Sequence, residues 1–63
     1  MIDKSDIVKL ETQVLIKARI LAHFVRINTG AHEWERDCIT STQRELIEAV
    51  DVYEAALREW AAR

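Results

Sequence analysis

Apolar residues crowd the stretch from residue 14 to residue 27, where they fill ten of fourteen positions. At about 100° per residue they cover most of the circumference of a helix, which we expect over about residues 4–28. A broad apolar face comprises Ile7, Leu10, Val14, Ala18, Leu21, Phe24 and Val25, widened by Val8, Leu15 and Ala22. A second, narrower stripe comprises Ile16, Ile20 and Ile27. An ordinary surface helix has one apolar stripe, so a single neighbouring helix is not enough to cover this one.

The second half of the chain has a simpler pattern. Its apolar positions alternate in steps of four and three, the spacing of a coiled-coil seam, at Leu46, Val50, Tyr53, Leu57 and Trp60. Two overlapping capping boxes, Thr40 with Gln43 and Thr42 with Glu45, favour a helix start just before this seam. We therefore expect a helix over about residues 41–62.

A short separate helix is expected between these two, over about residues 31–38. Trp34 and Cys38 are one turn apart, but they lie about 100° from the seam that begins at Leu46. One straight helix would point Trp34 away from the core, so we expect a break near residues 39–42 and an indole that caps the bundle end. Two alternatives stay open: a plain hairpin with a continuous second helix, and an exposed Trp34 that anchors a partner.

Both ends of the first helix carry sequence signals. Asp3 is expected to cap its start by accepting from a backbone N–H in the first turn. Gly30 is expected to adopt the left-handed conformation that ends it. The chain has no proline and one glycine. The sequence thus predicts a single all-α domain over residues 1–63, a helical hairpin of two long antiparallel helices with a short helical connector.

The chain is short for a domain that must be stable alone. A domain of this size buries only about 60% of its unfolded surface and usually needs a disulfide, a metal or oligomerisation. The one cysteine, Cys38, excludes an internal disulfide. We therefore expect two hairpins to form a homodimeric four-helix bundle. The residues expected at the dimer or partner interface are Ile16, Ile20, Phe24, Ile27 and Trp34.

No group of residues indicates catalysis. His32 and Glu33 begin like the H-E-x-x-H zinc motif, but Arg36 occupies the position of its second histidine. His32, Glu35 and Asp37 offer at most two ligands on one helix face, whereas a structural zinc site takes four. We therefore expect no enzymatic activity, no cofactor, no metal and no small-molecule substrate.

Charge and hydropathy limit the classes of partner and the location. The net charge is −2 and the sequence pI is about 5.6, which disfavours bulk attraction to nucleic acid or to an anionic membrane. A single thiol and the lack of a signal peptide predict a cytoplasmic location. The apolar run is shorter than the roughly twenty residues of a membrane span, so no membrane association is expected.

A basic strip on the first helix is the candidate nucleic-acid face, formed by Lys9, Lys17, Arg19, His23 and Arg26. A two-fold axis would double it into a basic groove, which is a surface that recognises RNA by shape and backbone contacts. The chain length and the hairpin layout resemble the Rop family, whose members pair two hairpins into a four-helix bundle and bind paired RNA loops along one helix face. The alternative is a solvated face whose cations pair with acids of the second helix.

Three functions fit this pattern. We expect first a small non-enzymatic protein–protein interaction module, in the style of phage or mobile-element accessory regulators, that binds a host protein such as a transcription factor and modulates or inhibits it. The alternatives are a Rop-like dimeric RNA-binding regulator and a structural subunit of a larger helical assembly.

Overall fold

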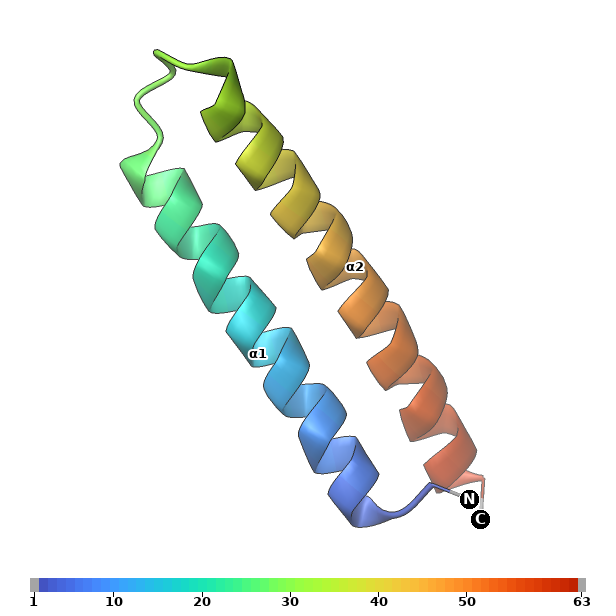
Figure 1. The fold of residues 1–63 in the computed structure, drawn as a ribbon. Coiled ribbons are helices and arrows are strands. Elements are labelled where there is room, and N and C mark those ends of the chain that lie inside the picture. Colours follow the sequence, from blue (N-terminus) through green and yellow to red (C-terminus); the bar gives the residue numbers. More distant parts are fainter. Residues whose placement is uncertain (1, 63) are drawn as a thin grey trace.

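The computed structural model describes residues 2–62 and contains two helices, α1 (Lys4–Ile27) and α2 (Glu33–Ala61). They run antiparallel along a rod of 50 × 14 × 12 Å, and the start of α1 and the end of α2 lie together opposite the loop (Figure 1). No strand occurs in the described residues. The all-α helical hairpin predicted from the sequence is confirmed.

Helix α1 begins where the sequence predicts. The Asp6 N–H donates to Asp3 Oδ1 at 3.0 Å and the Asp3 N–H donates to Asp6 Oδ2 at 3.2 Å, which completes a capping box. The cap predicted at Asp3 is therefore confirmed. The helix ends at Ile27, one residue earlier than expected, and Asn28 is extended. Gly30 has the predicted positive φ, 74°, but it lies in the loop beyond the helix end.

Helix α2 is one continuous helix of 29 residues, so the predicted break near residues 39–42 and the separate helices over about 31–38 and 41–62 are wrong. Neither proline nor glycine interrupts it. The Thr42 hydroxyl, expected to cap a new helix, donates instead to the Cys38 carbonyl at 2.8 Å. Such a bond satisfies a threonine inside a helix. The alternative left open by the sequence, a plain two-helix hairpin, is the observed fold.

The helices meet along small side chains of α2, which we call the contact line: Thr42, Ala49 and Ala56, one every seven residues. Thr42 is 5% exposed and Ala56 is 4% exposed. Small side chains bury little apolar area. Ile7 and Ala56 are accordingly the only buried apolar side chains among residues 2–62. The predicted seam flanks the contact line and remains partly exposed, at Leu46, Val50, Tyr53, Leu57 and Trp60.

A carboxylate from α2 closes the loop between the helices. Glu35, which is 9% exposed, accepts hydrogen bonds from the Thr29 N–H at 2.8 Å, the Thr29 hydroxyl at 2.9 Å and the Gly30 N–H at 3.1 Å. Hydrogen bonds to a charged acceptor are roughly twice as strong as neutral ones. We call this arrangement the Glu35 clamp. It ties the end of α1 to the first turn of α2.

The clamp makes the loop sensitive to acid. Burial of the Glu35 carboxylate alone would raise its pKa, but the hydrogen bonds from Thr29 and Gly30, together with the charge of His32, hold that pKa below its ordinary value. A carboxylate whose pKa is lowered by folding stabilises the protein above its ordinary pKa. This stabilisation is lost as the pH falls through the lowered value.

Replacing Glu35 with Gln should lower the Tm at neutral pH, because a neutral amide is a weaker acceptor for the loop N–H groups. The variant should also lose less stability than the wild type when the pH falls below 4.5, the ordinary pKa of glutamate. Thermal unfolding followed by circular dichroism at neutral and acid pH measures both effects. Glu33→Gln, exposed in the same turn, is the matched control and should keep the wild-type Tm. A wild-type Tm for Glu35→Gln at neutral pH would contradict the clamp.

Candidate interaction surfaces

One side of the hairpin carries a shallow groove, here called the polar groove. Its volume is about 330 Å³, and it is lined by Leu10, Gln13, Lys17, Glu45, Glu48, Ala49 and Val52. Within it Lys17 Nζ lies 3.3 Å from Glu45 Oε2, the single ion pair between described residues. The two side chains are 31% and 55% exposed, so solvent screens the pair and its contribution to stability is about 0–1 kcal/mol.

The opposite side of the hairpin is almost entirely apolar. On α2, Glu45 and Val52 each follow a member of the contact line by three residues, and both line the groove. Residues that follow a member by four, such as Leu46 and Tyr53, lie on the other side of the helix. On α1 the apolar positions of this other side recur by four and three, the spacing of a coiled coil. We call this side the apolar face. It is formed by Ile7, Val14, Ala18, Leu21 and Val25 of α1 and by Ile39, Leu46, Val50, Tyr53 and Leu57 of α2.

The apolar face is partly exposed in the hairpin. Of its members, Ile7 is buried, Ala18 and Val25 are exposed, and the others are half-buried. Val25 is 54% exposed, and Val8 and Leu15, at the edge of the face, are 50% and 52% exposed. Between Ile7 and Val25 on α1 and between Ile39 and Leu57 on α2, only two polar residues, Glu11 and Gln43, interrupt the four-and-three spacing. Contiguous exposed apolar surface of this kind marks an interaction site.

The isoleucine stripe predicted as an interface lies outside the contact between the helices. Ile16, Ile20 and Ile27 are 42%, 39% and 48% exposed. Ile20 and Ile27 follow Gln13 by seven and fourteen residues, so both border the polar groove and not the apolar face. Phe24, from the same prediction, is half-buried. The chain therefore exposes apolar side chains on two separate surfaces.

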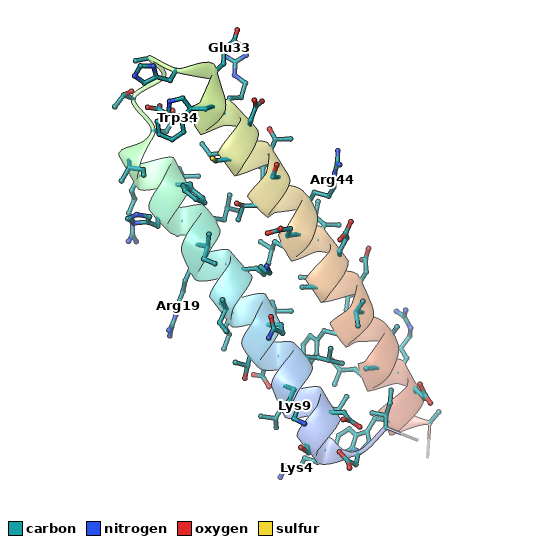
Figure 2. All side chains as sticks on the ribbon, in the orientation of Figure 1. Lys4, Lys9, Arg19, Glu33, Trp34 and Arg44 are labelled. Atoms are coloured by element: carbon teal, nitrogen blue, oxygen red, sulfur yellow. The ribbon has the colours of Figure 1, made fainter. Side chains whose placement is uncertain are left out.

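Trp34 lies in the first turn of α2 at the loop end (Figure 2). It is 56% exposed, and its ring stacks on His32 with the ring centroids 5.9 Å apart and the planes 17° apart. The indole therefore does not cap the end of the hairpin in the way we expected. Because α2 is continuous, Trp34 lies away from the core, as the sequence pattern predicts for one straight helix. It precedes Val52 by eighteen residues, or five turns, and so lies on the groove side.

Most of the predicted nucleic-acid face is exposed on α1, and Figure 2 shows Arg19 pointing away from α2. Its exposed members are Lys9, Arg19, His23 and Arg26. Lys17 is the exception, because it faces Glu45 in the polar groove. Helix α1 has five cations and two anions, a net charge of +3, whereas α2 has three cations and eight anions, a net charge of −5. The two outer faces of the hairpin therefore differ in sign.

Nothing else in the described chain forms a recognisable site. Within residues 2–62, His, Cys, Asp and Glu side chains form no group of three or more that would hold a metal ion. Neither helix, as far as the structure describes them, has an apolar stretch long enough to cross a membrane. No protein-family model matches this chain, and no curated protein or solved structure matches it.

Sequence reasoning missed the role of Glu35, which it treated as a weak metal ligand beside His32 and Asp37. The signal was present, because a glutamate in the third position of a helix commonly reaches back to N–H groups before the helix start. With the helix start expected at residue 31 and not at Glu33, Glu35 did not occupy that position in the prediction.

Replacing Lys17 with Met should raise the free energy of unfolding or change it by less than about 1 kcal/mol. The exposed ion pair to Glu45 contributes little, and an apolar side chain there packs between Leu10 and Leu21 on the side of α1 that meets α2. Urea unfolding at one fixed protein concentration measures the change, with Lys9→Met, outside the groove, as control. A loss well above 1 kcal/mol for Lys17→Met alone would show that the pair does more than an exposed pair should.

Proposed function

We propose that this protein is a non-enzymatic protein–protein interaction module that works as a homodimer, two hairpins forming a four-helix bundle. The observation that carries this proposal is the poor burial within one hairpin. The chain exposes 4990 Å², whereas a compact protein of 7.3 kDa exposes about 4,200 Å². The excess of about 800 Å² equals what each partner buries in a standard protein interface.

The shape of the hairpin supports the same proposal. Its radius of gyration is 14.6 Å, against about 11 Å for a compact chain of this length. Two helices form only one layer, and a layer that is apolar on one side is stable when a second layer covers it. A second hairpin supplies that layer and the burial that Ile7 and Ala56 alone do not provide.

The second apolar surface is the part of the module that binds another protein. The isoleucine stripe and Trp34 lie on the groove side, so both stay accessible when the apolar face is covered. Exposed Ile and Trp side chains beside a groove suit an amphipathic helix of a partner, and Trp is enriched among the residues that dominate binding energy. Occupying a helix of another protein alters what that protein binds, which is the regulatory role expected from the sequence.

Sedimentation equilibrium should give twice the monomer mass of 7.3 kDa at micromolar concentration. The Tm should rise with protein concentration, because mass action favours the dimer and the dimer is the stable folded species. A species of 7.3 kDa at high concentration, with a Tm independent of concentration, would contradict the proposal.

An RNA-binding function of the Rop type is the second candidate, because Arg19, His23 and Arg26 form an exposed basic face on α1. Affinity capture from the source cell separates the two functions. We expect the wild type and Arg19→Glu/Arg26→Glu to retain the same protein, and Ile20→Ala/Trp34→Ala to lose it. Recovery of RNA that only Arg19→Glu/Arg26→Glu abolishes would replace the protein-binding function with the RNA-binding one.

A further inference from the structure

We infer that the second copy covers the apolar face, and that the two hairpins pair with their loops at opposite ends. This inference rests on the proposed dimer and specifies its surface and orientation. The two-fold axis then runs perpendicular to the helices, so that α1 packs antiparallel on α1 of the second copy.

The choice of surface follows from what each side would bury. The polar groove is lined by Leu10, Ala49 and Val52 but also by Gln13, Lys17, Glu45 and Glu48. Covering it would bury three charged side chains, which costs free energy unless each finds a partner. The apolar face offers aliphatic side chains from both helices at coiled-coil spacing, with one polar residue on each helix. A symmetric dimer uses the same patch twice, and a patch of this composition is self-complementary.

The orientation follows from where the two polar residues, Glu11 and Gln43, lie along the long axis of the rod. We call this position the height of a residue and count it from the end opposite the loop. The contact between Lys17 and Glu45 shows the register of the hairpin, in which residues whose numbers add to 62 lie at the same height. The pair Leu10 and Val52, which both line the polar groove, agrees with this register. Gln43 therefore lies at the height of residue 19, and Glu11 lies about eight residues lower on the rod.

Two symmetric arrangements of the apolar faces are possible, and they place different neighbours beside Glu11. With the loops together, both copies of Glu11 lie in one layer, next to Asp51 and Glu54 of the second copy. With the loops apart, α1 (Lys4–Ile27) pairs about its midpoint, and Glu11 comes opposite residue 20 of the second copy. This is close to the height of Gln43 of the second copy, an amide donor within the apolar face. Like charges placed together destabilise an interface, whereas an amide N–H beside a carboxylate donates to it.

The net charges of the helices, +3 and −5, favour the loops-together arrangement when they are considered alone. Most of these charges lie on the outer faces, and beyond a Debye length of about 8 Å salt screens them. Glu11 lies within the apolar spacing itself, so its neighbours decide the orientation.

Distances between spin labels test the orientation directly. In a Cys38→Ala background, a label at Ala31→Cys in the loop should report a distance near the full 50 Å length of the rod. A label at Glu48→Cys, near the middle of the rod, should report a short distance in either arrangement and serves as the control. Short distances from both positions would overturn the inferred orientation and leave the dimer standing. No dipolar coupling at any position would overturn the proposed dimer itself.

A matched pair of apolar variants tests the surface. Val25→Glu should dissociate the dimer, whereas Ile20→Glu, which also replaces an exposed apolar side chain, should not. Dissociation by Ile20→Glu alone would place the second copy on the isoleucine stripe and overturn the inferred surface.

Discussion

The structure depends on the small residues at which the two helices touch. Thr42, Ala49 and Ala56 recur every seven residues and form the line of α2 that faces α1. Because the side chains on this line are small, much of the larger apolar surface of both helices lies beside the contact and not within it. One hairpin therefore has a very small hydrophobic core, with Ile7 and Ala56 as its only buried apolar side chains in residues 2–62. The exposed apolar face is a direct result of this off-centre contact.

The Glu35 clamp and the pair of Lys17 with Glu45 fix how far one helix is shifted along the other. The clamp holds the loop end through three hydrogen bonds to one carboxylate, and the ion pair lies further along the rod at 3.3 Å. Neither interaction buries much apolar area, so their effect is mainly on register. Register matters here because it sets the height of every polar residue on the apolar face, and a polar residue near a symmetric interface favours one pairing over another.

The sequence was sufficient for the architecture and insufficient for its details. Amphipathic spacing, the Asp3 cap and the position of Gly30 predicted two long antiparallel helices, and these are present, whereas the expected short helical connector is not a separate helix. The break near residues 39–42 was wrong because capping boxes are local signals, and a threonine satisfies its hydroxyl equally well inside a helix. How much of the apolar surface of α1 is covered by α2 was not predictable, because it depends on whether α2 turns its predicted seam or the neighbouring contact line toward α1. That choice is made by packing between distant residues.

The position of Trp34 has a consequence for the proposed binding of a target protein by the proposed dimer. It lies at the loop end of a rod 50 Å long, half exposed and stacked on His32. A dimer with its loops apart carries one indole at each pole. Both indoles bind one target molecule only if its two binding sites are spaced to match the length of the rod, and in that case binding of one indole raises the effective concentration of the other. For a target with a single site, the second indole remains free to bind another molecule, and the dimer acts as a crosslinker.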